Sequence, residues 1–367
     1  MTTTKRPGAR TVLIVSDGKH GPTATQMISF GQPFAGDGEN GSERIVFEKS
    51  YSKVADIEKA FAAHDADLLV LSRYTSARGT DWIRLARSDG IPVVFHTDDD
   101  LLAVPESVGE AKFKAYNDPA RLKALRENIE ASDLLYVSTA PLARRFQDHG
   151  FVLPIVAGDI YCSVKPDDIG ALVAPATGPV IGYMGTAGHA ADLAMVLPTV
   201  CELMESIPAL QFEVFGTIAM PPDLARFGTR VRHLAQVGDY AEFIAYLRTL
   251  GWWVGLAPLE DNTFNRCKSD TKWVEYSLAG IAVVASDLPL YDRACADGAG
   301  IQAATAQEWY DALNRMIYQP DLRRAMIDTA QAKLRQRYSH DALRDQVVET
   351  FNKAFATLGS AEMPARS

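Results

Sequence analysis

The chain has 367 residues, enough for two domains that each bury their own hydrophobic core. Hydrophobic residues make up 47% and charged residues 23%, a composition that excludes a disordered chain. The net charge of −9, with no long basic run, argues against a nucleic-acid partner.

Residues 1–10 are polar and lack the apolar core of a signal peptide. The most apolar stretches, such as 252–259, are too short to span a bilayer. We therefore expect a cytoplasmic protein whose contact with the inner face of a membrane is at most peripheral. Four scattered cysteines without C-x-x-C spacing predict free thiols in a reducing compartment: Cys162, Cys201, Cys267 and Cys295.

Strand-like and helix-like segments alternate through the first half of the chain. The helical patterns begin near Thr23 and cover 54–64 and 118–132. The expected strands are short apolar runs at 11–16, 44–48, 67–72, 92–96 and 134–138. This order predicts a mostly parallel sheet with helices on both faces.

A segment rich in Pro, Gly, Ala and Asp at 165–179 predicts a linker, after which the alternation resumes. Strands are expected at 180–185, 210–216, 231–235, 252–258 and 281–286. Helices are expected at 190–205, 239–251 and 271–280, and from 305 onward the chain is expected to be helical with breaks at Pro320 and Ser339. Ligands of open α/β sheets collect beyond the carboxyl ends of the strands, so two such domains would share a cleft.

The segment 257–291 carries the strongest functional signal. A buried strand leads into a polar loop and then into a helix whose N-cap is expected at Ser269. Lys268 would lie at the helix N-terminus, where free N–H groups favour an anion such as a diphosphate. Lys272 and Glu275 follow at spacings that place all three side chains on one face. The alternative is a solvated helix with a Lys272–Glu275 ion pair.

The pattern K-S-x-x-K-x-x-E-Y at 268–276, followed by A-G-I-A-V-V-A-S-D at 279–287, resembles the donor-binding segment of GT-B glycosyltransferases. The relevant group is the large one with the glutamate-x7-glutamate motif. The resemblance implies that Glu275 holds the ribose of the donor and Lys268 its diphosphate. It also implies an α/β fold of two Rossmann-like domains that face each other across a cleft. The implied parts are an acceptor domain at 1–170, a nucleotide-sugar domain at 171–338, and a C-terminal helix at 339–367 that crosses back to the first domain and ends in a tail.

One departure from the family pattern concerns the first glutamate of the motif, whose place is taken by Cys267. A thiol does not replace a carboxylate, so the donor sugar and the choice between retention and inversion stay open. Asn265 or Asp261 of the same loop would take over the sugar contacts. Ala282 also stands where proline is usual in the family.

The segment 180–193 places a glycine-rich turn between the first strand of the second half and a helix. Its glycine spacing is not the G-x-G-x-x-G fingerprint, which argues against a dehydrogenase. The resemblance places Gly185 and Thr186 against the phosphates, with His189 where many members carry Arg or Lys. A capping or packing role for His189 is the alternative. Gly216, at the end of the next strand, would lie near the nucleotide base.

The run H-T-D-D-D at 96–100 ends an apolar strand of the first half. It looks like the family segment in which a strand ends in a His-Asp pair that faces the cleft, with His96 on the acceptor side. Asp99 or Asp98 would then be the base of an inverting reaction or would position the acceptor of a retaining one. The alternative is that the aspartates cap the next segment. Asp-x-Asp also suggests a metal site, but the same pattern recurs by chance at 65–67.

Together these features predict a glycosyltransferase that moves a hexosyl-type sugar from a nucleoside diphosphate sugar to a hydroxyl acceptor. The acceptor would be a saccharide or lipid-linked saccharide of bacterial surface polysaccharide or glycoconjugate synthesis. No cofactor and no metal are expected, because lysines and helix N-termini neutralise the leaving diphosphate in this family. A nucleotide-sugar epimerase of the same fold and a non-catalytic nucleotide-sugar-binding protein are the alternatives.

The residues expected at the site fall into three groups by their predicted role. The catalytic candidates are Asp99, Asp98 and Lys268. The donor-binding residues are expected to be Gly185, Thr186, His189, Gly216, Asn265, Lys268, Ser269, Lys272 and Glu275. The acceptor-side residues are expected to be Lys19, His20 and His96, with Arg73 and Tyr74 similarly placed after a strand.

Overall fold

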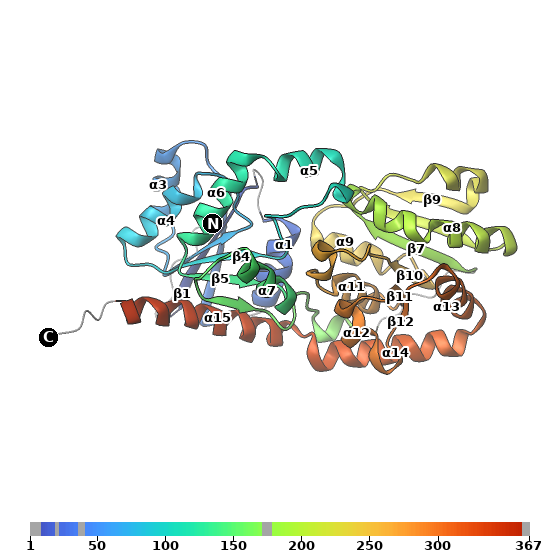
Figure 1. Ribbon diagram of the computed structural model, residues 1–367. Coiled ribbons are helices and arrows are strands. Elements are labelled where there is room, and N and C mark those ends of the chain that lie inside the picture. Colours follow the sequence, from blue (N-terminus) through green and yellow to red (C-terminus); the bar gives the residue numbers. More distant parts are fainter. Residues whose placement is uncertain (1–8, 19–21, 36–40, 171–177, 362–367) are drawn as a thin grey trace.

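Two parallel six-stranded sheets, each flanked by helices, make up the structure (Figure 1). The computed structural model describes residues 9–18, 22–35, 41–170 and 178–361, the side chains of 358–361 excepted. The α/β class expected from the alternating segments is confirmed. In this described part of the chain, no helix is both long and apolar enough to cross a membrane.

The first sheet has the strand order β2-β1-β3-β4-β5-β6, and every neighbouring pair is parallel. The runs of β3 and β4 are buried along their whole length because helices cover both faces of the sheet. The carboxyl ends of β1 and β3 meet where Ser16 pairs with Ser72. The strands are β1 (Arg10–Ser16), β2 (Glu43–Glu48), β3 (Leu68–Ser72), β4 (Val93–Thr97), β5 (Leu134–Val137) and β6 (Ile155–Ala157).

Two layers of helices enclose the first sheet. One face is covered by α3 (Val54–Ala62), α4 (Gly79–Ser88), α6 (Pro119–Glu130) and α7 (Ala140–Asp148). The other face is covered by α1 (Ala24–Gln26), η1 (Met27–Gly31), α2 (Gln32–Phe34) and the last helix of the chain, α15 (His340–Ala361). Two short helices between β4 and α6, η3 (Glu106–Val108) and α5 (Glu110–Tyr116), reach toward the second half (Figure 1).

The second sheet has the order β12-β11-β10-β7-β8-β9 and is also parallel throughout. Its strands are β7 (Val180–Gly185), β8 (Gln211–Gly216), β9 (Val231–Leu234), β10 (Val254–Ala257), β11 (Ala282–Ser286) and β12 (Ile301–Ala303). Helices of the second half lie on both faces of this sheet. They are η5 (Ala187–His189), α8 (Ala190–Ser206), η6 (Pro222–Arg230), α9 (Tyr240–Leu247), α10 (Thr263–Arg266), α11 (Thr271–Leu278), α12 (Pro289–Cys295), η7 (Ala296–Gly298), α13 (Ala306–Tyr318) and α14 (Pro320–Arg337).

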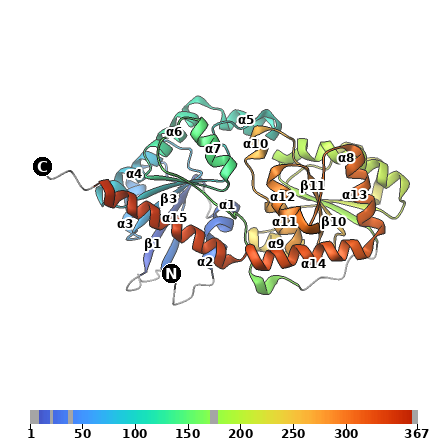
Figure 2. The ribbon, with the colours of Figure 1, turned by 60° about the horizontal axis from the view of Figure 1, so that its bottom comes forward.

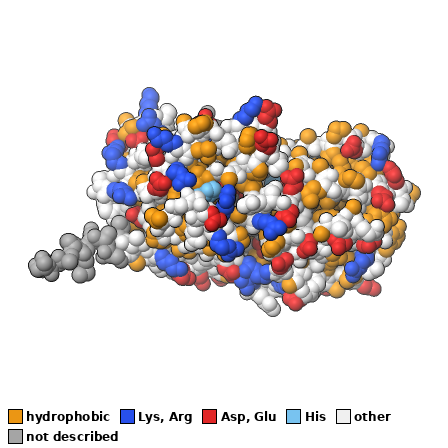
Figure 3. Space-filling view, viewed as in Figure 1, with side chains coloured by type: hydrophobic (Ala, Val, Ile, Leu, Met, Phe, Trp, Pro, Cys, Tyr) orange, Lys and Arg blue, Asp and Glu red, His pale blue; other side chains and the backbone are white. Residues whose placement is uncertain are grey.

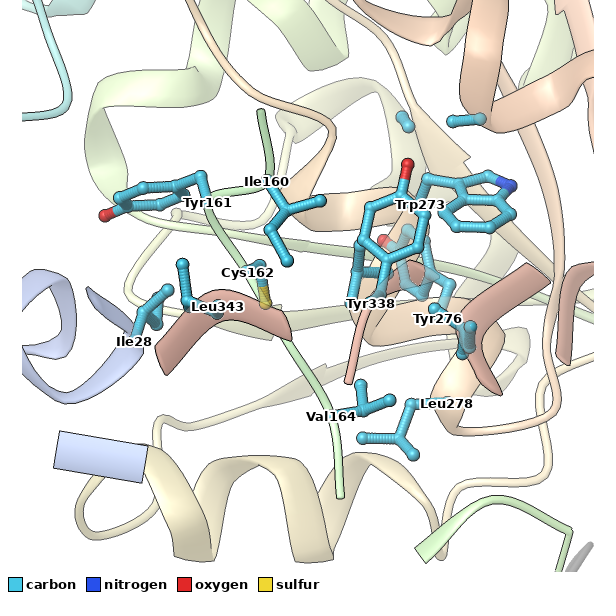
Figure 4. Close-up of a cluster of buried hydrophobic side chains, with 14 of the residues drawn as sticks. Ile28, Ile160, Tyr161, Cys162, Val164, Trp273, Tyr276, Leu278, Tyr338 and Leu343 are labelled. Carbon is cyan, nitrogen blue, oxygen red and sulfur yellow. The ribbon is translucent and has the colours of Figure 1, made fainter. Parts of the chain in front are cut away.

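Within the described residues, the chain passes from one half to the other at two places. Backbone hydrogen bonds join these two segments to each other. The Val164 N–H donates to the Tyr338 carbonyl at 2.7 Å, and the His340 N–H donates to the Val164 carbonyl at 3.0 Å. Figure 4 shows the buried apolar side chains of both halves that surround this pairing. Within this cluster the rings of Trp273 and Tyr338 lie with their centroids 5.4 Å apart. We call the paired crossings at 158–169 and 338–340 the hinge; they include η4 (Pro166–Asp168).

The two C-terminal helices run along both halves. Figures 1 and 2 show α14 beside the second sheet and α15 continuing along the first. The expected break positions are confirmed, because α14 begins at Pro320 and α15 begins directly after Ser339. The second half of the chain therefore ends on the first half of the molecule.

The halves also touch on the side opposite the hinge. Phe264 and Cys267, from the loop that carries α10, are buried in the hydrophobic core of the first half. The Thr139 hydroxyl donates to the Cys267 carbonyl at 2.7 Å across the junction. A Cβ built on Gly188 would lie 2.8 Å from Nζ of Lys112, which shows how closely α5 approaches η5. The space between the sheets is thus bounded by contacts on two sides.

Acidic and basic side chains are interspersed over the face of the molecule drawn in Figure 3. This distribution agrees with a net charge of −9 that has no basic run. All four cysteines are buried free thiols, as the sequence predicted.

Candidate functional site

A cleft of about 660 Å³ lies between the two sheets. Loops that follow the carboxyl ends of strands in both halves form its walls, as expected for two open α/β sheets. The first half contributes Ser16, Asp17, Thr23, Thr25, Arg73, Asp98, Asp99, Tyr116, Arg121 and Tyr161, among others, and the second half Thr186, His189, Lys268, Ser269, Lys272 and Glu275.

A network of four charged side chains crosses the cleft. Arg73 Nη1 donates to Asp98 Oδ1 and, at 2.9 Å, to Asp99 Oδ2. Lys268 Nζ, from the second half, donates to Asp99 Oδ1 at 3.2 Å. Burial alone would raise the pKa of Asp99, but Lys268 and Arg73 hold it far below its ordinary value. Asp99 is therefore a firmly ionised carboxylate that links the two halves.

Arg73 takes its position from an unusual backbone conformation. It follows β3 with φ of 50°, in the left-handed region, and its N–H donates to the His96 carbonyl at 2.7 Å. This bend turns the guanidinium to Asp98 and Asp99 at the end of the neighbouring strand.

The three aspartates of the H-T-D-D-D run have separate surroundings. Asp98 Oδ2 accepts from the Tyr161 hydroxyl at 2.7 Å and from the Thr25 hydroxyl at 3.1 Å, on the wall of the cleft. Asp100 is buried, where it accepts from Arg145 Nε at 2.9 Å and contacts His149 Nε2 at 2.9 Å. The carboxyls of Asp98 and Asp100 thus point into different sites. Among the described residues, no group of three or more His, Cys, Asp or Glu side chains is arranged to hold a metal ion.

His96 lies in the core of the first half, which corrects its expected place on the acceptor side. Its side chain is buried within β4, its Nδ1 lies 3.1 Å from the Ser72 hydroxyl, and its ring packs against Phe30 and Tyr136. Burial lowers its pKa to about 4. Tyr74 is likewise fully buried, with its hydroxyl 3.0 Å from that of Ser50. Lys19 and His20 lie outside the described residues.

His189 borders the cleft from the second half, at the junction of η5 and α8. Its Nδ1 lies 2.8 Å from Asp192 Oδ2. The charge of Lys272, followed by burial, lowers the pKa of His189 to about 4. Its imidazole is therefore neutral at pH 7. Gly185 and Thr186, in the turn before η5, line the adjoining surface.

Lys272 and Glu275 face the cleft from α11. Lys272 Nζ lies 5.7 Å from the centroid of the Tyr183 ring, and burial lowers its pKa. Glu275 is 8% exposed and accepts from the Tyr240 hydroxyl at 2.8 Å. Burial raises the pKa of Glu275 to about 7, although the Tyr240 hydrogen bond and the Lys272 charge act in the opposite direction. A solvated helix with a surface ion pair is excluded by this burial.

A second hollow of about 410 Å³ adjoins Glu275. Its apolar wall contains Phe215 and Phe243, whose rings are stacked with centroids 5.0 Å apart. Gly216 lines it with φ of 117°, and a Cβ there would lie 2.4 Å from the Gly185 carbonyl oxygen. Only glycine fits this position without displacing the turn beside it. The hollow has the apolar flat wall that suits a nucleotide base.

The loop around α10 differs from the sequence-based expectation. Cys267, which was not expected to replace a carboxylate, is 4% exposed and packs into the first half. Asn265 is also buried, and its amide nitrogen donates to the Glu260 carbonyl at 3.0 Å and to Asp192 Oδ1 at 3.3 Å. Asp261 pairs with Arg266 on the surface. Asn265 therefore supports Asp192 from the edge of a smaller hollow of about 170 Å³ beneath α5.

Ser269 lines the cleft but is not the helix N-cap that its position predicted. The N-cap of α11 is Asp270, and the Ser269 hydroxyl lies 2.8 Å from that of Thr271. Lys268 is consequently two residues ahead of the N-cap, with Nζ 4.7 Å from the Phe264 ring centroid.

Sequence reasoning gave little weight to two arginines on the first-half wall. Arg73 neutralises both cleft aspartates, and the guanidinium of Arg121 lies 4.1 Å from the centroid of the Tyr116 ring. The only sequence signal for Arg73 was its place directly after a buried strand. For Arg121, inside an amphipathic helix pattern, there was none.

Structures with the same architecture are known. HepE of Anabaena, in complex with UDP-glucose, aligns at 15% identity over 94% of this chain and 99% of that one, with a TM-score of 0.65. The fold is GT-B. A UDP-forming trehalose-phosphate synthase of Burkholderia xenovorans, in complex with glucose-6-phosphate, gives 15% identity over 94% and 100% of the two chains and a TM-score of 0.62. A glycosyltransferase of Rickettsia africae gives 12% identity over 95% and 99%, with a TM-score of 0.64.

These likenesses confirm the GT-B fold that the sequence predicted. Neither a protein-family model nor a curated protein matches the chain. The GT-B cleft of this chain is the space lined by Lys268, Lys272, Glu275, Asp98 and Asp99.

Proposed function

We propose that the chain is a glycosyltransferase that moves a sugar from a nucleoside diphosphate sugar to a hydroxyl group of a saccharide or lipid-linked saccharide. The observation that carries this proposal is the convergence of Lys268, Lys272 and Glu275 from the second half with Asp98 and Asp99 from the first half on one cleft. The UDP-glucose bound to HepE, a protein of the same fold, supports a nucleoside diphosphate sugar as the donor.

The second half, at 171–338, is assigned to the donor. Lys268 and Lys272 bind its diphosphate, with the turn at Gly185 and Thr186 beside it. Glu275 binds the ribose hydroxyls, in the role of the second glutamate of the glutamate-x7-glutamate motif. The base occupies the hollow against Phe215 and Gly216.

The first half, at 1–170 with the helix from 339 packed on it, is assigned to the acceptor. An acceptor oxygen forms a bond to the anomeric carbon while that carbon loses its bond to the diphosphate. Asp99 and Asp98 orient the acceptor hydroxyl, whose proton leaves either to one of these carboxylates or to the departing phosphate oxygen. Lys268 stabilises the negative charge of the departing diphosphate, which is usually the largest contribution to such a rate.

The contact between Lys268 and Asp99 makes the basicity of Asp99 depend on whether the donor is bound. Without a donor, Lys268 holds the pKa of Asp99 low and so keeps it a poor proton acceptor. A diphosphate that draws Lys268 away leaves Asp99 with Arg73 alone and makes it more basic. We place the reaction on the cytoplasmic side, in surface polysaccharide or glycoconjugate synthesis, with at most peripheral membrane contact.

A binding screen tests the proposal. The melting temperature is measured with UDP-, GDP-, dTDP- and CMP-sugars, each with and without EDTA. We expect one nucleotide sugar to stabilise the protein, and EDTA to leave this unchanged because lysines do the neutralising. No stabilisation by any of them would remove the donor site, and loss of the effect in EDTA would establish a metal.

The matched variants are Lys268→Met and Lys353→Met. Lys353 lies on the exposed side of α15 and pairs with Glu349 at 2.8 Å, far from the cleft. Loss of Lys268 is expected to lower the rate of sugar transfer by about 100-fold or more, as for other groups that stabilise developing charge. Lys353→Met is expected to transfer at the wild-type rate.

A nucleotide-sugar-binding protein without activity is the second candidate, and the burial of Cys267 favours it. The position of the first motif glutamate is closed inside the contact between the halves rather than open to a sugar. Donor binding without hydrolysis or transfer to any acceptor would establish this candidate. Conversion of the donor sugar with no acceptor present would establish the epimerase instead.

A further inference from the structure

His189 occupies a position that three hollows share. The main cleft, the hollow beside Phe215 and the smaller hollow beneath α5 are all lined in part by this side chain. It follows the turn at Gly185 and Thr186 in the sequence, and it lines the main cleft together with Lys268 and Lys272. The charges of both lysines reach the imidazole, so an anion bound on them would act on it too.

The orientation of the ring is fixed by Asp192. Asp192 is 5% exposed, and its other oxygen accepts from the Glu260 N–H at 2.9 Å. Burial would raise the pKa of Asp192, but its hydrogen bonds to His189 and Glu260 lower it, so it is ionised. An ionised carboxylate requires a donor, and this assigns the hydrogen of the neutral ring to Nδ1. Nε2 is then the nitrogen without a hydrogen, and it is the one available to a ligand.

The two lysines oppose a proton on this ring in the empty cleft. Lys272 and Lys268 lower the pKa of His189, whereas Asp192 raises it. The same two lysines are the proposed ligands of the donor diphosphate. A diphosphate on them cancels their field and adds negative charge of its own, while the attraction of Asp192 stays in place.

We propose that His189 takes up a proton when the donor binds and holds the diphosphate as an imidazolium, so that donor binding is coupled to proton uptake. This inference rests on the proposed function, because it requires a diphosphate on Lys268 and Lys272. The charged ring donates from Nε2 to a phosphate oxygen and from Nδ1 to Asp192. The second-half wall of the cleft thus gains a cation beside Lys268 and Lys272 only while the anion is present, which a permanently charged arginine at this position would not achieve.

Other titratable groups line the same hollows as His189. Asp99 and Arg73 line the main cleft together with it, and Lys112 lines the hollow beneath α5. The Tyr183 hydroxyl donates to the His189 carbonyl at 3.4 Å and stays neutral, since burial raises its pKa far above the ordinary value. Glu275, whose pKa is about 7, binds ribose as a carboxylate and therefore releases a proton when the donor binds. This opposite linkage is present in every His189 variant and cancels when they are compared with the wild type.

The protonation state can be read directly. The protein is labelled at histidine Cε1 and its ring signals are recorded at pH 6 with and without UDP-glucose, or with GDP-mannose or dTDP-glucose where that nucleotide sugar is the one bound. The diphosphate of a nucleotide sugar does not itself titrate near this pH. The chain has seven histidines, and loss of one signal in His189→Gln assigns it. We expect that signal to move from the neutral to the imidazolium position when the donor binds.

Affinity gives a second readout. The dissociation constant of the same nucleotide sugar is measured from pH 7 to pH 5 for wild type, His189→Gln and Asp192→Asn. The ratio of the His189→Gln constant to the wild-type constant is expected to grow by about tenfold per pH unit as the pH falls, since one proton is taken up. His64→Gln is the matched control, because His64 also contacts a carboxylate, Glu48 at 3.1 Å, outside the cleft.

The outcomes separate this inference from the proposed function. A donor that binds while the His189 signal stays neutral, with a ratio independent of pH, overturns the inference and leaves the glycosyltransferase proposal intact. A protein that binds none of the nucleotide sugars overturns both. If His189→Gln is unstable, the pH dependence of the dissociation constant is compared between wild type and Asp192→Asn instead. Asp192→Asn removes the negative charge that retains the proton on His189, so its affinity is expected to rise less than that of wild type as the pH falls.

Discussion

Glu275 combines burial with a place in the proposed donor site. Its carboxyl accepts one hydrogen bond, from Tyr240, and Lys272 on the same helix is the cation that acts on it. This environment raises its pKa to about 7 from an ordinary 4.5. The native state therefore binds this proton more tightly than the unfolded chain does. The stability that this difference contributes is fully present below pH 4.5, the pKa of the unfolded chain, and is lost as the pH rises through 7.

Glu275→Gln is expected to remove this pH dependence. The side chain keeps its shape and can still accept from Tyr240, but it carries no charge. We compare the unfolding free energy of the variant with that of wild type at each pH. The difference, variant minus wild type, is expected to be about 2 kcal/mol larger at pH 8 than at pH 5. Urea denaturation at the two pH values measures this difference.

The same variant is expected to bind a nucleotide sugar at least about tenfold more weakly, because a neutral amide replaces the carboxylate at the ribose. A variant that is more stable at pH 8 and still binds normally would show that Glu275 is a buried polar residue without a ligand. If Glu275→Gln and wild type differ in unfolding free energy by the same amount at pH 5 and pH 8, Glu275 does not titrate between these pH values.

At this scale, helical spacing was the informative part of the sequence. Lys268, Lys272 and Glu275 were expected together from their spacing, and the structure brings them to one cleft. His96 shows the limit of such reasoning, since a strand buried on both faces gives no signal for the side that a residue faces. The role of Arg73 depends on a left-handed backbone and on partners from another strand, which no local pattern encodes.

The helix α15 completes the first half from the far end of the chain. Its residue Gln346 accepts from the N–H groups of Asp159 and Ile160 at 2.7 and 3.1 Å. The amide nitrogen of Gln346 donates to the Tyr136 hydroxyl at 2.8 Å and to the Ile160 carbonyl at 2.9 Å. One side chain thus ties the helix to the hinge and to β5.

Gln346→Ala is expected to destabilise the protein by roughly 2–3 kcal/mol, because it leaves several polar groups near the core without partners. Lys353→Ala, on the exposed side of the same helix, is the control and is expected to cost about 0.5 kcal/mol or less. Urea denaturation followed by circular dichroism measures both. Equal effects would mean that Gln346 contributes no more than a surface residue.

Elements with long apolar or amphipathic patterns were predictable, and short ones were not. The runs at 11–16 and 180–185 became β1 and β7 to within one residue. β6 and β12 have three residues each and were not expected, since so short a run carries no periodicity. The packing of α10 against the other half was also not predicted, because it is a contact between residues more than 100 positions apart, as for Thr139 and Cys267.

The whole molecule is held at two places on opposite sides of its cleft. One is the hinge, where the backbone at Val164 pairs with both Tyr338 and His340. The other is the contact of Phe264 and Cys267 with the core of the first half. A continuous backbone makes the hinge permanent, whereas the second contact consists of non-covalent packing and the hydrogen bond from Thr139 to Cys267. The second contact is therefore the one that an opening motion would break.

Phe264→Ala is expected to favour an open molecule. It removes a buried ring from the contact between the halves, a loss of roughly 3 kcal/mol for a phenylalanine in a core. Small-angle X-ray scattering is expected to give a larger radius of gyration than for wild type. Phe227→Ala is the matched control, because Phe227 is equally buried at 8% exposure but lies within the core of the second half.

The control is expected to lose stability while keeping the wild-type radius of gyration. If Phe264→Ala also keeps it, the ion pair of Lys268 with Asp99 and the contact of α5 with η5 are sufficient to hold the cleft closed.

The double crossing of the chain also has a consequence for the order of synthesis. Leu343, Val347 and Phe351 of α15 are buried in the same cluster as Val12 and Ile14 of β1. A ribosome makes β1 more than 300 residues before α15, the helix that completes the cover of this face. Until then the nascent first sheet exposes part of this apolar face to solvent. A chaperone that binds apolar surface would find its target there until α15 has been made.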